Sequence, residues 1–205
     1  MLGMIFFGSA GTLRYWEAWV FMAVLFIPVA LVVFYLLRHD PELLERRLKA
    51  REERAQQKAI TSLAALAWLV GFLLPGLDRR FAWSSVPTPL VLFADLLVLA
   101  GYLIFFLTLR ENRFASRIIQ VEEGQTVITS GPYALVRHPM YFGVVLMLLF
   151  APLALGSWWA SIPSLATPVL LALRIQDEEA ALLEGLPGYR DYTQQTTHRL
   201  IPGVW

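Results

Sequence analysis

Long apolar runs, separated by charged or proline-containing segments, constrain this chain more than any other feature. The hydrocarbon core of a bilayer is about 30 Å thick, which about 20 apolar helical residues span. Residues 15–37, 59–77 and 86–109 supply three runs of about that length, the second ending at Pro75-Gly76. Because 57% of the 205 residues are hydrophobic and the mean hydropathy is +0.56, we expect an all-α membrane protein.

Two shorter apolar runs follow, at residues 140–155 and 158–173, with a hinge at Gly156-Ser157 between them. Three prolines interrupt these runs: Pro152, Pro163 and Pro168. We therefore expect a tight C-terminal helical hairpin, bent or tilted in the membrane. Together the runs predict about five transmembrane helices.

The remaining segments are polar. Residues 38–58 mix basic and acidic side chains at helical spacing, which predicts a solvated or surface-lying helix. Residues 110–138 form a polar loop, with a short β-like piece at 126–129. From residue 174 the chain opens as an acidic helix and turns at 186–188, so we expect a cytoplasmic C-terminal helix.

The distribution of basic residues predicts the orientation. Cytoplasmic loops of membrane proteins are enriched in Lys and Arg. Fourteen of the 17 basic residues lie in residues 38–58, in residues 110–138 or from residue 174 onward, and three lie on the other side of a five-span topology, at Arg14, Arg79 and Arg80. We therefore expect the N-terminus outside, and the polar loop and the C-terminus in the cytoplasm.

The stretch from Thr129 to Gly143 reads Thr-Ser-Gly-Pro-Tyr-Ala-Leu-Val-Arg-His-Pro-Met-Tyr-Phe-Gly and concentrates polar chemistry at the mouth of the hairpin. Pro139 suits the first turn of a helix, so Arg137 and His138 stand just before a helix N-terminus. Unpaired backbone N–H groups there, beside a guanidinium and an imidazole, favour an anionic or hydrogen-bond-accepting ligand. The alternative is an interfacial anchor that reaches to lipid headgroups.

Arg174 and Glu178 are four residues apart and share one helix face. One interpretation is an ion pair that closes the cytoplasmic end of a membrane helix. The other is a site, because a guanidinium can hold a carboxylate bidentately, and a carboxylate can hold ribose hydroxyls or balance a cationic ligand. Methyl transfer from a sulfonium donor needs both functions.

The sequence gives no support for a metalloprotein, a soluble nucleotide-binding domain or a nucleic-acid-binding protein. The chain has no cysteine, no dinucleotide or phosphate-binding glycine motif, and no His spacing typical of a metal site, so we expect no metal. The near-zero net charge gives no indication of a nucleic-acid partner. Asp95 and Glu17 lie within expected spans and are functional candidates without a named partner.

Taken together, the motifs resemble the isoprenylcysteine carboxyl methyltransferase family, and integral-membrane phospholipid N-methyltransferases share much of the pattern. The resemblance covers roughly residues 120–202 and rests on these pieces: Thr129-Ser-Gly-x-Tyr133, Arg137-His-Pro-x-Tyr141-x-Gly143, Arg174-x-x-x-Glu178-Glu179, Tyr189, Tyr192 and Ile201-Pro202. It implies an S-adenosylmethionine site built by the C-terminal hairpin, the loop before it and the C-terminal helix. We thus expect a single domain over 1–205, with three N-terminal spans in 1–109 and a cofactor-binding catalytic core in 110–205.

The resemblance also implies roles for individual residues. Arg174 matches the arginine that orients the methyl-accepting carboxylate, and is expected to be both catalytic and substrate-binding. Apart from the resemblance, an amine acceptor needs a base, and Glu179, which we expect to be catalytic, or His138 would serve as that base. The cofactor-binding residues implied are Gln120, Gln125, Thr126, Val127, Ile128, Tyr133, Arg137, His138, Pro139, Met140, Tyr141 and Glu178.

The expected function is therefore S-adenosylmethionine-dependent methylation of a lipid or lipidated small molecule, with a carboxylate of the isoprenylcysteine type favoured. A phospholipid amine is the alternative acceptor. A sterol-type membrane reductase that uses NADPH and a non-enzymatic membrane scaffold are further alternatives. The expected partners are the lipid substrate and membrane lipids, while the acceptor and the oligomeric state stay open.

Overall fold

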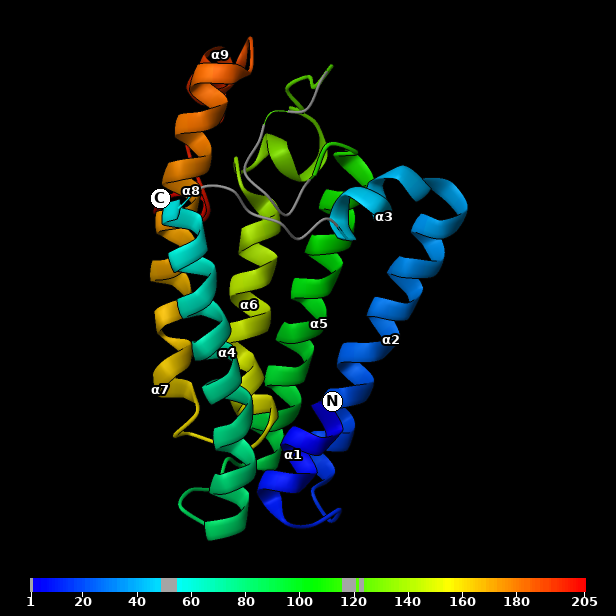
Figure 1. Cartoon of the computed structure of the whole chain (residues 1–205), viewed down its shortest axis with the longest axis vertical. Coiled ribbons are helices and arrows are strands. Elements are labelled where there is room, and N and C mark those ends of the chain that lie inside the picture. The colour runs from blue at the N-terminus through cyan, green and yellow to red at the C-terminus, as the bar shows by residue number, and fades with distance from the viewer. Residues whose placement is uncertain (1, 49–54, 116–120, 122–123) are drawn as a thin grey trace.

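The fold is a helical bundle, seen here in a computed structural model that describes residues 2–48, 55–115, 121 and 124–205. Within these residues all regular secondary structure is helical. The long helices lie side by side along one axis of the molecule (Figure 1). The described part of the chain thus has the expected all-α class.

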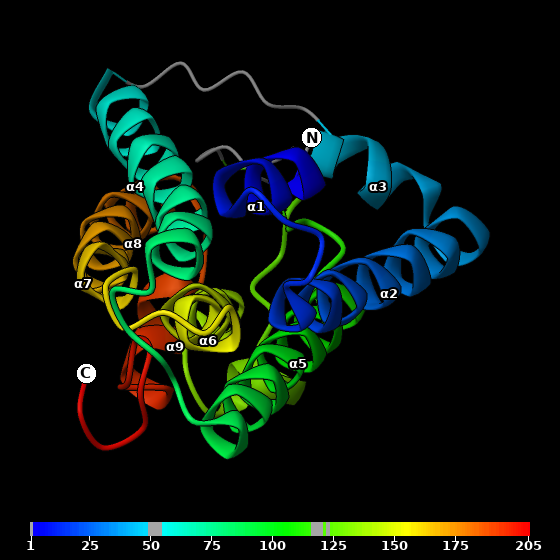
Figure 2. The ribbon, with the colours of Figure 1, turned by 90° about the horizontal axis from the view of Figure 1, so that it is seen from below.

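The N-terminal half contributes three long helices and two short ones. Their bounds are α1 (Leu2–Ala10), α2 (Trp16–His39), α3 (Pro41–Leu48), α4 (Ala55–Phe81) and α5 (Thr88–Glu111). Helix α1 was not expected from the sequence. It contacts α4 and α2 at the end of the bundle where α2 begins (Figure 2).

The C-terminal half contributes the hairpin and the polar end of the bundle. Its elements are the 3₁₀ turn η1 (Gly131–Ala134), α6 (Pro139–Ala154), α7 (Ser161–Ser164), α8 (Ala166–Gly185) and α9 (Tyr189–Gln195). Helix α6 is the central helix, in contact with α2, α4, α5, α7 and α8 (Figure 2). It therefore packs against helices from both halves of the chain.

The long helices alternate in direction. Helices α2, α5 and α8 run towards the end of the bundle that carries α3, η1 and α9, and α4 and α6 run away from it (Figure 1). The loop after α5 and the residues after α8 thus meet at one end, as the five-span prediction requires. Which side of a membrane this end faces stays a prediction.

Two helices of the described chain, α2 and α5, are long and apolar enough to cross a bilayer, and α6 is a shorter apolar helix of 16 residues. Each of the five apolar runs forms helix in whole or in part. Two candidate spans are therefore established by length and composition, while the count of five stays a prediction.

The structure corrects the expected end of the second run. Pro75 and Gly76 lie inside α4, which continues to Phe81. The reason is tertiary: a Cβ atom on Gly76 would lie 1.8 Å from the Ser9 hydroxyl of α1, so the two helices approach closely at this glycine. Packing against α1 outweighs the hydrogen bond that Pro75 removes.

The second arm of the hairpin also differs from expectation. Residues 158–173 do not form one helix, because the chain after α6 is held in a turn: the Ser157 hydroxyl donates a hydrogen bond to Asp78, and the Trp158 indole donates one to the Ser85 carbonyl, 3.1 Å away. Helix α8 begins only at Ala166, but then continues without a break through the acidic segment to Gly185.

The predictions for two polar segments are corrected as well. The expected β-like piece at 126–129 has no regular structure, since no strand lies beside it in the described chain and an isolated strand leaves its backbone groups unpaired. Of the surface helix expected over 38–58, residues 41–48 form α3, while 38–39 belong to α2 and 55–58 to α4. Residues 49–54 lie outside the described residues.

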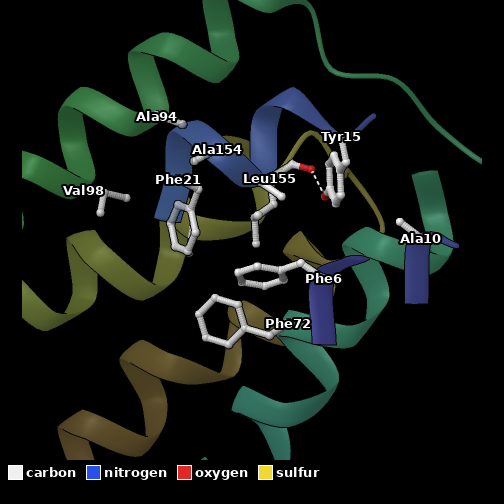
Figure 3. Close-up of a cluster of buried hydrophobic side chains, with 11 residues drawn as sticks. Phe6, Ala10, Tyr15, Phe21, Phe72, Ala94, Val98, Ala154 and Leu155 are labelled. Carbon is white, nitrogen blue, oxygen red and sulfur yellow. Dashed lines mark hydrogen bonds between the residues drawn. The ribbon is translucent and has the colours of Figure 1, made fainter. Parts of the chain in front are cut away.

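The largest buried cluster lies at the end of the bundle opposite η1 and α9. Phe6, Phe21 and Phe72 bring α1, α2 and α4 together, with ring centroids 5.6 to 6.1 Å apart (Figure 3). The Tyr15 hydroxyl donates a hydrogen bond to the Leu155 carbonyl at the end of α6, which ties α6 to α2. This cluster fixes one end of α6 and leaves its N-terminus at the other.

A second constraint on α6 is its close crossing with α5. A Cβ atom on Gly101 would lie 2.6 Å from the Gly143 carbonyl oxygen, and a Cβ atom on Gly143 would lie 2.6 Å from the Gly101 carbonyl oxygen. Only glycine permits this approach at both positions. The glycine that ends the 129–143 motif therefore sets the position of α6 against α5.

Candidate functional site

The site begins at the N-terminus of α6. Pro139 is the first helical residue, as expected, and His138 precedes it with φ −125° and ψ 59°. The backbone N–H groups of Arg137 and His138 donate to the carbonyl oxygens of His198 and Arg199, at 3.0 and 2.8 Å. The C-terminal segment thus lies along the residues that enter α6.

A buried charge cluster holds these two segments to α8. Arg137 Nε lies 2.6 Å from Glu179 Oε1, and Arg199 Nε lies 2.7 Å from Glu179 Oε2. His138 Nε2 lies 3.3 Å from Glu179 Oε1. The Arg137 and Glu179 side chains are only 7% and 6% exposed, so the pair is largely removed from solvent.

Arg137 has a second function in this cluster. Its Nη1 atom donates to the carbonyl oxygens of Thr196 and Thr197, both 2.8 Å away. One guanidinium therefore holds the carboxylate of α8 and the backbone of the C-terminal segment together. Sequence analysis did not identify this role or that of Arg199, because Arg199 follows Glu179 by 20 residues and no helical periodicity links them.

The electrostatics of Glu179 follow from its neighbours. Burial by itself would raise the pKa of this carboxyl group, but hydrogen bonds from His138, Arg137 and Arg199 outweigh burial and lower the pKa to about 2. Glu179 is therefore ionised at neutral pH and is a weak base.

Beside this cluster, Tyr141 joins the other two charged residues of α8. Arg174 Nε donates a hydrogen bond of 2.9 Å to the Tyr141 hydroxyl, which donates one of 2.5 Å to Glu178 Oε2. The sequence had suggested that Arg174 and Glu178 either pair as a helix-end ion pair or form a site. The structure shows them sharing one tyrosine hydroxyl.

A cavity opens at this end of the bundle, between the N-terminus of α6, residues 125–128, the last turns of α8 and the start of α9. Eleven of the twelve residues expected to bind the cofactor line it, and Gln120 lies outside the described residues. The eleven are Gln125, Thr126, Val127, Ile128, Tyr133, Arg137, His138, Pro139, Met140, Tyr141 and Glu178.

Other lining residues were not assigned to the site from the sequence. Ala181 and Leu182 follow Glu178 by three and four residues, so helical periodicity was a signal that could have found them. The remaining ones come from the end of α5 and from the segment that contains α9: Asn112, Phe114, Ala115, Leu186, Tyr189 and Tyr192. Tyr189 and Tyr192 already belong to the motif that carries the family resemblance, whereas the other four positions needed the tertiary fold.

Polar contacts fix the aromatic wall of the cavity. The Asn112 amide donates to the Tyr133 hydroxyl over 2.9 Å, and the Tyr192 hydroxyl donates to the Tyr133 carbonyl over 2.7 Å. Burial raises the pKa of Tyr192 to about 12, so its hydroxyl keeps the proton that this bond requires. The wall therefore combines rigid aromatic faces with a few polar groups.

Arg174 and Glu179, the two residues expected to be catalytic, are not among the lining residues. Arg174 is joined to the cavity through Tyr141, whereas Glu179 lies behind Arg137 and His138. The low pKa of Glu179 and its three hydrogen-bond donors favour a positioning role for this residue over that of a base.

Glu17 and Asp95, the two acidic candidates of the N-terminal half, do not line the cavity either. Glu17 lies 3.6 Å from Arg79 at the opposite end of the bundle. Asp95 is 4% exposed in the second turn of α5, and neither of its carboxylate oxygens has a hydrogen-bond partner in the described chain. The structure therefore does not connect them with this site.

Fold and site together define a class: a helical membrane protein with a partly polar, partly aromatic ligand cavity at one end of its bundle. Residues 90–184 match the isoprenylcysteine carboxyl methyltransferase (ICMT) family, so the chain carries a domain of that family. Enzymes of this family are integral-membrane, S-adenosylmethionine-dependent methyltransferases, and the match assigns S-adenosylmethionine-dependent methyl transfer to the domain over residues 90–184. A search of curated proteins finds no match.

The cavity has the chemical groups that S-adenosylmethionine requires. The Glu178 side chain is 28% exposed and lines the cavity, where a carboxylate can accept hydrogen bonds from hydroxyl groups or face a positive charge. Tyr133, Tyr189 and Tyr192 supply aromatic faces for a purine ring. The residues present therefore fit the cofactor.

Proposed function

We propose that this methyltransferase transfers a methyl group to the carboxylate of a lipidated acceptor of the isoprenylcysteine type. The observation that carries the proposal is the position of Arg174, which is tied to the cavity by the Tyr141 hydroxyl but does not line it. A donor in the cavity and an acceptor held by Arg174 thus lie on the two sides of Tyr141.

The depth of Arg174 favours a membrane-borne acceptor. Arg174 precedes Glu178 by four residues on α8, which corresponds to about 6 Å along the axis. Since α8 runs towards the end that carries α9, Arg174 lies deeper in the bundle than Glu178 (Figure 1). A carboxylate at the head of a lipid chain reaches this depth from the apolar part of the bundle.

The site also favours a carboxylate over an amine. A carboxylate is already nucleophilic, whereas an ammonium group must first lose a proton to a base. Glu179 is poorly suited to accept it, because both of its oxygens are engaged by arginines and its pKa is about 2. Methylation of an amine would depend on His138, whose side chain is 4% exposed beside Glu179.

The chain's own residues then have separate functions. When bound, S-adenosylmethionine supplies a methyl group on a positively charged sulfur. Glu178 holds the donor side, Arg174 holds the acceptor carboxylate in line, and the buried wall around Tyr141 excludes water. Glu179 keeps Arg137 and His138 in place at the start of α6.

The proposed topology completes this picture. We place the N-terminus outside, five helices in the membrane, and the cavity with the C-terminus on the cytoplasmic face. The supports are the concentration of basic residues at one set of loops and the alternating direction of the long helices.

The test uses the purified full chain in nanodiscs. We expect saturable binding of S-adenosylhomocysteine by calorimetry, and transfer of labelled methyl from S-adenosylmethionine to N-acetyl-S-farnesylcysteine. Vesicles that contain phosphatidylethanolamine serve as the amine-bearing acceptor. Labelling of the phospholipid alone would replace the carboxylate proposal with N-methylation, and labelling of neither acceptor would overturn both.

A further inference from the structure

The hydroxyl group of Tyr141 links Arg174 and Glu178. The two hydrogen bonds, 2.9 Å from Arg174 Nε and 2.5 Å to Glu178 Oε2, meet on one oxygen atom. Under the proposed function, Glu178 belongs to the donor side and Arg174 to the acceptor side. One hydroxyl therefore touches both halves of the reaction.

Chemistry fixes the direction of both hydrogen bonds. A guanidinium only donates, an ionised carboxylate only accepts, and a phenol has one proton to give. The Tyr141 proton must therefore point at Glu178, which leaves the oxygen lone pair for Arg174. A phenylalanine at this position could make neither bond.

The hydrogen bond from Nε also orients the Arg174 side chain. A guanidinium is planar, so fixing the Nε–H direction fixes the plane in which the terminal nitrogens lie. Bidentate capture of a carboxylate depends on that plane. The position of the Tyr141 oxygen thus sets how Arg174 meets an acceptor.

The ring of Tyr141 is itself held in place. It lies beside the His138 ring, with centroids 5.8 Å apart, and packs against a cluster that contains Val145, Ile175 and Leu200. Removal of the hydroxyl alone should therefore leave the ring where it is. The hydroxyl can be tested separately from the packing.

We propose that Tyr141 is a positioning residue that couples donor binding to acceptor binding through its hydroxyl. The inference rests on the proposed function. A donor that engages Glu178 fixes the carboxylate, which holds the Tyr141 hydroxyl and through it the plane of Arg174. Binding energies at two linked sites are reciprocal, so donor and acceptor each strengthen the other's binding.

The experiment measures this coupling without turnover. The dissociation constant of N-acetyl-S-farnesylcysteine is determined with and without saturating S-adenosylhomocysteine. We expect the wild-type chain to bind the acceptor at least about fivefold more tightly with the product analogue present. In Tyr141→Phe that ratio should fall to near one. Each protein is measured at its own saturating concentration of S-adenosylhomocysteine, so a change in donor affinity does not alter the comparison.

Two further variants make the result specific. Tyr35→Phe removes a hydroxyl from a residue of α2 that does not line the cavity, and should keep the full ratio. Arg174→Lys breaks the same connection from the other side, since lysine has no Nε–H in that plane, and should also abolish the ratio. This second variant tests the inference even if Tyr141→Phe does not fold.

The outcomes separate the inference from the proposed function. A wild-type chain that binds S-adenosylhomocysteine but neither binds nor methylates the farnesylated carboxylate overturns the proposed acceptor, and with it the coupling. A wild-type ratio that survives in Tyr141→Phe or in Arg174→Lys overturns the inference alone. If the wild-type chain binds the acceptor equally well with and without S-adenosylhomocysteine, the inference is also overturned, while the proposed function stands.

Discussion

The guanidinium of Arg137 and the carboxylate of Glu179 form a buried ion pair, with 2.6 Å between Nε and Oε1. Arg199 approaches the other oxygen of the same carboxylate, so one acidic group of α8 serves two basic groups from different segments. The entrance to α6 and the C-terminal segment therefore depend on Glu179 for charge balance.

Replacement of Glu179 by glutamine should destabilise the fold. An amide keeps the size of the side chain but leaves the buried Arg137 without a counter-charge, and loss of one partner of a buried pair typically costs about 3–5 kcal/mol. We expect a clear fall in the thermal midpoint in detergent. Glu184→Gln, a matched change on the exposed last turn of α8, should have little effect. Equal midpoints for the two variants would contradict the role of Glu179.

The same carboxylate predicts a dependence on pH. Its pKa in the folded chain is about 2, below the ordinary value of 4.5, so it contributes stability above pH 4.5 that is lost as the pH falls towards 2. As the pH falls through that window, the thermal midpoint of the wild-type chain should therefore decrease more steeply than that of Glu179→Gln. Parallel pH profiles for the two proteins would argue against this shift.

The crossing of α5 and α6 predicts a large cost for a single methyl group. In Gly101→Ala the new Cβ atom meets the Gly143 carbonyl oxygen at 2.6 Å, which requires the helices to separate. We expect a destabilisation of about 1–3 kcal/mol and weaker binding of S-adenosylhomocysteine, because the N-terminus of α6 moves with the helix. Gly71→Ala in α4 is the control: nothing lies within 4 Å of its added Cβ, and alanine favours a helix.

Arg174 and Glu178 should differ in their effects on binding and turnover. Arg174→Ala is expected to keep near-normal affinity for S-adenosylhomocysteine and to lose turnover, since the acceptor is no longer held in line. Glu178→Ala should weaken donor binding. Calorimetry and a methyl-transfer assay on both variants distinguish these effects. Full turnover in Arg174→Ala would remove its acceptor role and favour an amine-bearing phospholipid.

Reporter fusions test the orientation. The basic residues at the end of the bundle that carries α9 predict that a reporter fused after Trp205 is active only in the cytoplasm. A reporter in the turn between α4 and α5 should be active only on the other side. A C-terminal reporter active outside would contradict the five-span topology.

Much of the candidate site could be predicted from local signals. Pro139 marked the start of a helix, and the motif around it identified the residues before and after. Periodicity put Arg174 and Glu178 on one face of α8. These features depend on residues close in the sequence, so they can be predicted without knowledge of the tertiary contacts.

Other parts could not be predicted because they depend on contacts between distant segments. The pairing of Arg199 with Glu179, the hydroxyl of Tyr141 between Arg174 and Glu178, and the packing of α1 against Gly76 join residues with no fixed spacing. Local rules failed for the same reason at Pro75, which stays helical because α1 packs against the next residue.

The sequence by itself determined the class of this protein: apolar runs long enough for a bilayer, their approximate positions, and a polar motif at the start of one helix. Those properties follow from composition and periodicity along the chain. Only the tertiary structure decided what the motif residues contact, because the central helix α6 is positioned by a glycine crossing with α5 and by charges from α8 and the C-terminal segment. Buried charges and close backbone contacts acquire partners only when these segments meet.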